Sequence, residues 1–113
     1  MFDLNHPTFI PLRDVHHFDE ILNGPRALIF KHSPACGSSA FVHDLVADFA
    51  KKNPGRAMYI VDVIGQRPLS QHIAERLDVR HQSPQALVIE HGHVVWTKSH
   101  YAITHTALAE HLS

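Results

Sequence analysis

Apolar residues follow two spacings along the first third of the chain. Over residues 15–22 they recur at helical spacing, which predicts a helix. The Asn-Gly-Pro sequence at 23–25 ends that helix, because glycine suits the position after a helix and proline cannot continue one. The short apolar run 26–30, "RALIF", predicts a buried strand.

A second helix is predicted from Cys36 to about Asn53. Its apolar stripe contains Phe41, Leu45 and Phe49, with two valines, Val42 and Val46, beside them. The next apolar run, 57–64, predicts a second buried strand. Because a helix connects the two strands, we expect them to be parallel.

The last part of the chain is predicted to contain a helix, a hairpin and a final helix. The first helix covers about 68–77, and Pro68 suits its first turn. "ALVIEHGHVVW", residues 86–96, predicts a hairpin that turns at His91-Gly92. Thr104 is the expected N-cap of a helix that runs through Leu112. The fold class is therefore α/β with a mixed sheet, and the 113 residues suggest a single domain over 1–113.

Composition restricts the possible partners. Hydrophobic residues make up 44% of the chain, charged residues 19%, and the formal net charge is −1 without a long run of either sign. This balance argues against a nucleic-acid or membrane-surface protein. The start of the chain lacks the pattern of a signal peptide, and a lone cysteine cannot form an internal disulfide. We therefore expect a cytoplasmic location.

Twelve histidines are the unusual feature of the composition. The only close pairs are His16-His17 and His91-His93, and neither has an acid or cysteine set at the spacing of a known zinc motif. We interpret them as surface and loop residues and predict no metal site.

Cys36, the only cysteine, lies where the first strand gives way to the long helix. Backbone N–H groups of Gly37, Ser38 and Ser39 and the helix dipole are then expected to stabilise its thiolate. Lys31 and His32, just upstream, add positive charge. An inert buried cysteine is the alternative, but the flanking Pro, Ala, Gly and Ser residues are typical of an exposed turn.

Two loops are further candidates. Ser83-Pro84 precedes the third strand, although a proline there can simply mark the start of a strand. "SHYAIT", residues 99–104, joins the hairpin to the last helix. Loops at strand ends beside a helix N-terminus are natural ligand sites in α/β sheets, but this segment could equally be an ordinary connection.

The sequence resembles the thioredoxin fold, a mixed four-stranded sheet flanked by helices, with an extra N-terminal helix. More narrowly, it is similar to the YtxJ-like family, the monothiol bacilliredoxins of the bacillithiol system. The matching segments are "FKHSPACGSSA", "VDVIGQRPLSQHIAERLDVRHQSPQALVI" and "HVVWTKSHYAIT". The chain departs from the family's C-P-x-S-type motif, because it has Cys36-Gly37-Ser38-Ser39, and its central strand lacks the buried acid of thioredoxins.

The resemblance implies a mechanism and a set of site residues. Cys36 is the nucleophile of a thiol–disulfide oxidoreductase, Ser39 stands in place of a resolving cysteine, and Ser83 beside a cis Pro84 pairs with the substrate backbone. The co-substrate is bacillithiol, the partners are bacillithiolated proteins, and no tightly bound cofactor is expected. Candidate donors for the thiol's carboxylates are Lys31, His32, His81, Ser99, His100, Tyr101 and Thr104.

Other functions remain open at this point. Cys36-Gly37-Ser38-Ser39 approaches the CGFS motif of monothiol glutaredoxins, so an iron–sulfur carrier is one alternative. A glutathione-dependent monothiol redoxin is another, since glutathione also has carboxylates. A scaffold that keeps the fold without the chemistry is a third.

Overall fold

A computed structural model describes residues 9–112. The elements in chain order are β1 (Ile10–Pro11), α1 (Val15–Leu22), β2 (Ala27–His32), α2 (Gly37–Lys52), β3 (Met58–Asp62), α3 (Arg67–Leu77), β4 (Gln85–Glu90), β5 (His93–Ser99), the 3-10 helix η1 (His100–Ala102) and α4 (His105–Leu112).

The five strands form one mixed sheet in the order β1-β3-β2-β4-β5. β1, β3 and β2 are parallel, as the connecting helix predicted for β2 and β3, and β4 and β5 form the predicted antiparallel hairpin. His91 and Gly92 make its turn, both at positive φ, a conformation that glycine adopts without strain.

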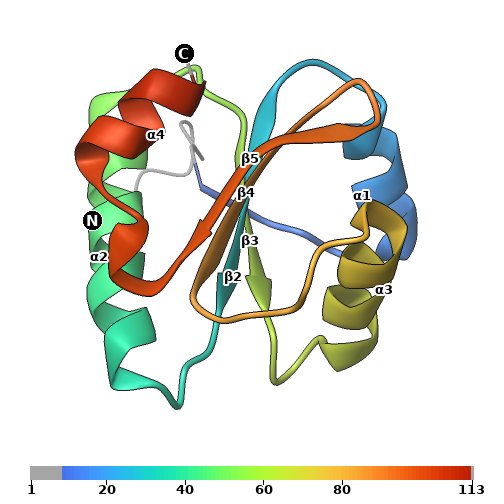
Figure 1. Ribbon diagram of the computed structural model, residues 1–113, viewed down its shortest axis with the longest axis horizontal. Coiled ribbons are helices and arrows are strands. Elements are labelled where there is room, and N and C mark those ends of the chain that lie inside the picture. Colours follow the sequence, from blue (N-terminus) through green and yellow to red (C-terminus); the bar gives the residue numbers. More distant parts are fainter. Residues whose placement is uncertain (1–8, 113) are drawn as a thin grey trace.

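Helices cover both faces of the sheet (Figure 1). α2 and α4 lie on one face, where Val42, Val46 and Leu108 pack on Leu28 and Phe30 of β2. α1 and α3 lie on the other face and pack on the alternate side chains of the same strand, Ala27 and Ile29. β2 is therefore apolar on both sides, which is typical of a central strand.

The sheet has five strands, so the four-stranded prediction is wrong. The additional strand, β1, has only two residues, one of them a proline, and it pairs with Tyr59 and Ile60 of β3. So short a strand has no periodicity to detect. The predicted N-terminal helix is present as α1, but it follows this strand, so the N-terminal addition is a strand and a helix.

Phe41 differs from its prediction as part of the buried stripe of α2. Val42, Val46 and Phe49 are buried, whereas 60% of Phe41 is exposed. Residues spaced by four do not stay on one side of a helix with 3.6 residues per turn. Phe41, the first residue of the stripe, therefore points away from the sheet.

Within residues 9–112, no helix has the length and apolar character to cross a membrane. The single-domain prediction also covers residues 1–8 and 113, which lie outside the described residues.

Candidate active site

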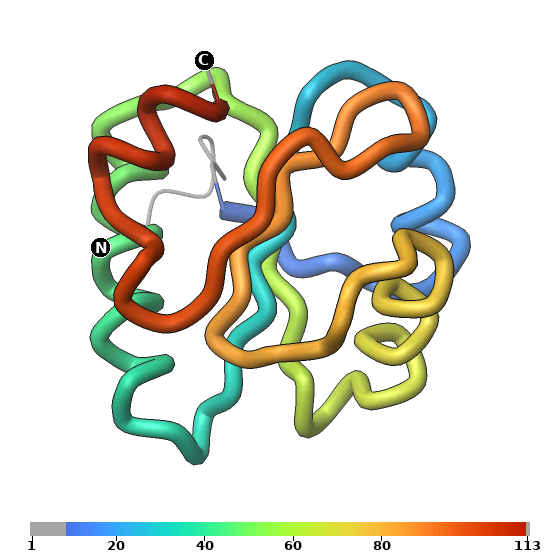
Figure 2. Tube along the Cα trace, viewed as in Figure 1, coloured from blue at the N-terminus to red at the C-terminus, as the bar shows by residue number. Residues whose placement is uncertain are grey.

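Four connections meet at one end of the sheet (Figure 2). The parallel strands β2 and β3 end there, with His32 paired to Asp62. β4 starts at the same end because Gln85 pairs with Lys31, and β5 finishes there because Ser99 pairs with Gln85. The loops that carry Cys36, Ser83-Pro84 and η1 are thus brought together by strand register alone.

Cys36 is the N-cap residue of α2. Its backbone is extended, with φ −110° and ψ 125°, and its carbonyl accepts the N–H of Ala40 at 3.1 Å. The side chain is half-buried, and Sγ lies 3.1 Å from Oγ of Ser38. A thiol in this place faces the unpaired N–H groups of the first helical turn.

Its surroundings lower the pKa of Cys36 below the ordinary value for a cysteine. The hydroxyl of Ser38 is the main cause, followed by the backbone N–H of Ser39, while desolvation acts in the opposite direction. Hydrogen bonds to the charged form favour it. Since the thiolate is the nucleophile, this site is suited to disulfide exchange.

Ser39, at the position of a resolving cysteine, is fully buried. Its Oγ accepts the backbone N–H of Ser33 at 2.9 Å and lies 3.0 Å from Nδ1 of His32. While the oxygen accepts from Ser33, the hydroxyl can donate its proton to an unprotonated Nδ1. These bonds connect the end of β2 to the first turn of α2 and hold the loop around Cys36.

The ring of His32 lies on the α2 face of the sheet. It stacks on Phe30 and is 4.8 Å from the ring of His43, centroid to centroid. Burial is the largest cause of a lowered pKa of His32, and His43 adds to it, while Asp62 and Asp44 oppose. His32 is therefore neutral near pH 7, which fits the proton donated by Ser39.

Lys31 lies elsewhere than the sequence suggested. It is completely buried on the opposite face of β2, where Nζ donates to the backbone carbonyl of Ser70 at 3.0 Å and lies 3.1 Å from Nδ1 of His81. Burial lowers its pKa to about 8. Successive residues of a strand point to opposite faces, so Lys31 and His32 cannot both face the Cys36 loop.

The Ser83–Pro84 peptide bond is cis. Pro84 is buried and directly precedes Gln85, the first residue of β4, which places it at the level of His32. Its carbonyl accepts the N–H of His100 at 2.9 Å, which joins the proline loop to η1. Contact between Pro84 and the thiol of Cys36 stays a prediction.

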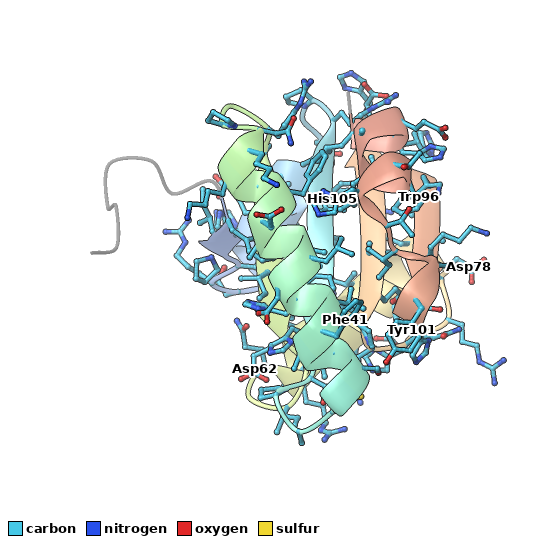
Figure 3. The ribbon with its side chains drawn as sticks, turned by 90° about the vertical axis from the view of Figure 1, so that its left-hand side faces the viewer. Phe41, Asp62, Asp78, Trp96, Tyr101 and His105 are labelled. Carbon is cyan, nitrogen blue, oxygen red and sulfur yellow. The ribbon has the colours of Figure 1, made fainter. Side chains whose placement is uncertain are left out.

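Tyr101 and Phe41 form an exposed aromatic pair from two elements (Figure 3). Tyr101 of η1 is 63% exposed, and its ring meets that of Phe41 of α2 edge to face at 5.7 Å between centroids. Thr104 has a local function, because its Oγ1 accepts the N–H of Ala107 at 3.1 Å as the predicted cap of α4. The predicted donors to the carboxylates of the small thiol therefore lie in different places. Lys31 and His32 are on opposite faces of β2, and Tyr101 is in η1.

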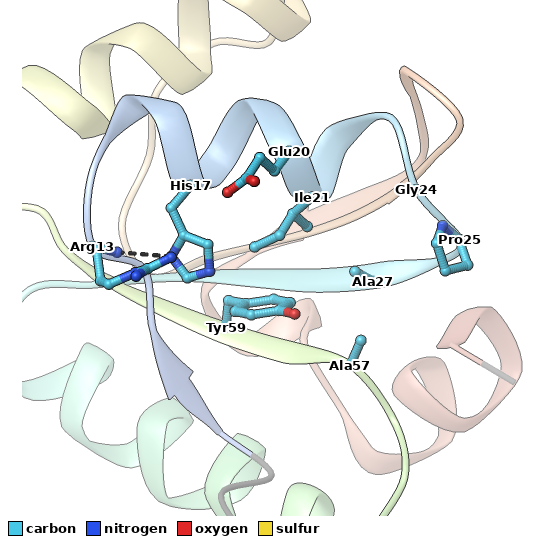
Figure 4. A pocket seen from close by; sticks show the side chains of 9 residues that line it. All are labelled: Arg13, His17, Glu20, Ile21, Gly24, Pro25, Ala27, Ala57 and Tyr59. Carbon is cyan, nitrogen blue, oxygen red and sulfur yellow. Dashed lines mark hydrogen bonds between the residues drawn. The ribbon is translucent and has the colours of Figure 1, made fainter.

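A groove of about 390 Å³ lies at the opposite end of strands β2 and β3 from Cys36 (Figure 4). Tyr59 and the starts of β2 and β3 form one side of it, and α1 with His17 and Glu20 the other. It opens beside Ala57 and Pro25, whereas Cys36 follows the far end of β2, so it is separate from the thiol.

Sequence reasoning missed Ser70 and the exposure of Phe41. Ser70 gave no signal, because it lies inside a predicted helix and contacts Lys31 through its backbone carbonyl, which every residue has. Phe41 could have been found from Asp44 and Asp48, which lie three and seven residues further on and therefore share its side of the helix.

A thioredoxin-type sheet with one activated cysteine at the start of α2 and a serine one turn later defines a monothiol redox protein. The chain belongs to the family of the monothiol bacilliredoxin BrxC, whose family model matches residues 10–108.

Solved structures agree with this fold. A protein described as having a thioredoxin fold, and provisionally as an oxidoreductase, is 29% identical, with a TM-score of 0.84 over 94% of this chain and 95% of its own. Thioredoxin from Trypanosoma brucei brucei is 13% identical, with a TM-score of 0.78 over 99% of this chain and 94% of its own. A structure from a study of thiol resolution in a yeast mitochondrial 1-Cys peroxiredoxin is 16% identical, with a TM-score of 0.73 over 95% of each chain.

Proposed function

We propose that this protein removes bacillithiol from protein mixed disulfides by taking it onto Cys36. The observation that carries the proposal is the lone thiol at the start of α2, with its pKa lowered by Ser38, and a buried serine in place of a second thiol. Membership of the monothiol bacilliredoxin family supports the choice of bacillithiol. A cytoplasmic location, where such thiols stay reduced, is part of the same proposal.

The exchange needs two steps. The Cys36 thiolate attacks the bacillithiol sulfur of the mixed disulfide, a new S–S bond forms on Cys36, and the protein sulfur leaves as a thiolate that takes a proton from water. A second bacillithiol then attacks the adduct. It releases bacillithiol disulfide and returns Cys36 to a thiolate, so each protein mixed disulfide that is reduced consumes one free bacillithiol.

Ser39 explains why the mixed disulfide between Cys36 and bacillithiol persists until a second small thiol attacks it. A cysteine at this position would attack the adduct from within the chain, whereas a hydroxyl cannot. Ser39 is moreover engaged with Ser33 and His32, so it keeps the loop geometry without taking part in the exchange.

The backbone around Ser83 is the proposed contact for the target protein. Ser83 precedes β4 and is half-buried at the end of the sheet where Cys36 lies. An extended segment of the target can form backbone hydrogen bonds with the loop at this position.

A transfer assay with two substrates tests the small-thiol assignment. One model protein is prepared as a mixed disulfide with bacillithiol and, separately, with glutathione, and the rate at which each thiol moves onto Cys36 is measured by intact mass. We expect faster transfer of bacillithiol. Equal or faster transfer of glutathione would overturn the bacillithiol assignment and leave the monothiol mechanism standing.

The absorption spectrum of freshly purified protein separates this proposal from the iron–sulfur alternative. A carrier that holds a cluster through Cys36 and small thiols absorbs in the visible region, whereas a thiol shuttle is colourless. Cys36→Ser is the control, because it removes the only cysteine ligand of the chain.

A further inference from the structure

Three basic side chains gather around a small cavity on the α3 face of the sheet. The cavity, of about 50 Å³, is lined by Val63, Arg67, Ser70, Gln71 and His81. Lys31 lies beneath it, bonded to two of the lining residues: Nζ is 3.0 Å from the carbonyl oxygen of Ser70 and 3.1 Å from Nδ1 of His81.

The positive charge of this group has no acidic partner among residues 9–112. None of the ion pairs in this part of the chain includes Lys31 or Arg67. The charges that act on His81 are both cationic, Lys31 and Arg67. Asp62, the acid at the end of β3, pairs in register with His32 of the neighbouring strand and acts to raise the pKa of His32. A buried cation without a counter-charge is costly, and such groups concentrate at functional sites.

His81 and Arg67 both offer hydrogen-bond donors to a ligand in the cavity. Because Nδ1 of His81 accepts from Lys31, the ring carries its proton on Nε2, and Nε2 is a donor. The guanidinium of Arg67 supplies further donors in a planar fork, which suits a carboxylate or phosphate group. His81 and Arg67 are exposed, so a ligand can reach both.

We propose that this cavity binds a small oxyanion group, a carboxylate or a phosphate, between Arg67 and His81. The bound anion supplies the counter-charge that the buried Lys31 lacks. This site goes beyond the proposed exchange at Cys36. The volume exceeds what one water molecule needs and matches a group of a few heavy atoms.

Titration of the His81 ring by NMR tests the site in the full chain. Inorganic phosphate and L-malate are added separately, in chloride buffer at constant ionic strength. We expect a saturable shift of the His81 signals and a rise in the pKa of His81, because a bound anion favours the protonated ring. Arg67→Gln should weaken binding about tenfold, the loss expected for one charge-assisted hydrogen bond.

Arg76→Gln is the matched control, because it removes the same charge from the last turn of the same helix. It should bind phosphate as the wild type does. A linear, unsaturated response to both anions, or equal binding by the two arginine variants, would overturn the proposal and leave a water-filled cavity.

A second arm identifies the source of the oxyanion. If the cavity receives a carboxylate of the small thiol, Arg67→Gln slows bacillithiol transfer to Cys36 and saturating phosphate slows it in the Arg76→Gln variant. If the ligand is a free ion, phosphate binds and the transfer rate is unchanged. The NMR experiment needs no thiol exchange, so its failure would leave the proposed function untouched.

Discussion

Neighbouring residues of β2 have opposite chemical surroundings. His32 faces α2 and bonds the serine that holds the Cys36 loop, whereas Lys31 faces α3 and is buried without an acid. Cys36 depends on neither for its lowered pKa, which Ser38 and the backbone of Ser39 produce. The lowered pKa of the thiol is therefore a local property of three residues, Cys36, Ser38 and Ser39.

Ser38→Ala should raise the pKa of Cys36, because it removes the hydroxyl that lies 3.1 Å from Sγ. Thiolate absorbance at 240 nm, followed against pH, measures the change. In the wild type the midpoint should lie below that of a free cysteine. Ser33→Ala, the same substitution on the other side of Cys36, is the control. An unchanged midpoint in Ser38→Ala would show that the hydroxyl does not stabilise the thiolate.

Lys31 should make the stability of the fold depend on pH in the alkaline range. Its pKa is about 8 in the folded protein and ~10.4 when unfolded, so between these values the unfolded chain binds more protons and the free energy of unfolding rises with pH. Relative to Lys31→Met, the wild type should gain about 3 kcal/mol between pH 7 and pH 10.5.

Urea unfolding at the two pH values measures this difference. Lys98→Met, at an exposed position of β5, is the control and should follow the wild type. Parallel pH profiles for the wild type and Lys31→Met would mean that Lys31 is not a buried cation with a lowered pKa.

At the scale of elements, α2 begins at Gly37 with Cys36 as its N-cap. Ser39 therefore lies in the first turn, with its side chain directed toward His32 and Ser33. The helix start thus places a thiol and a potential second thiol one turn apart.

Ser39→Cys should convert the protein into a dithiol that forms an internal disulfide. One helical turn is the separation at which a resolving cysteine can reach the nucleophile. Mass spectrometry of the oxidised variant should show a loss of two daltons, and Asp44→Cys, at an exposed position about two turns beyond Cys36 along α2, should show none. If Ser39→Cys lost no mass on oxidation, the start of α2 would be misplaced.

The pattern of apolar residues predicted those helices and strands that are long enough to show such a pattern. All four α-helices and strands β2 to β5 were expected, with ends within three residues, because each has an apolar face or run against the sheet. β1 has two residues and no such pattern. At the site, Cys36 and its serines could be found because helix starts have local rules. The burial of Lys31 could not be predicted. It depends on which face of β2 each side chain takes and on the packing of α3 against that face.

At the scale of the molecule, the end of the sheet near Cys36 combines a buried proline loop with an exposed aromatic pair. η1 is tied to Pro84 by the N–H of His100 and to α2 by the contact between Tyr101 and Phe41. Exposed aromatic residues at the same end of the sheet as Cys36 favour contact with a protein substrate.

Replacing Phe41 with serine should lower kcat/KM for a protein mixed disulfide by roughly 5–30-fold, the effect of losing about 1–2 kcal/mol of contact. Exchange with the small symmetrical disulfide of bacillithiol should be almost unchanged, since it lacks the protein surface. Val95→Ser, at an exposed position of β5, is the control. An equal loss with both substrates would mean that the pair acts on the thiol and not on docking.

Single-turnover transfer, followed by intact mass, tests the central claim most directly. Reduced protein is mixed with one equivalent of a bacillithiolated target, without free thiol, and both chains are weighed. The account predicts that this protein gains one bacillithiol on Cys36, that the target is released reduced, and that Cys36→Ser gains nothing. A stable disulfide between Cys36 and the target, or no gain at all, would contradict the account.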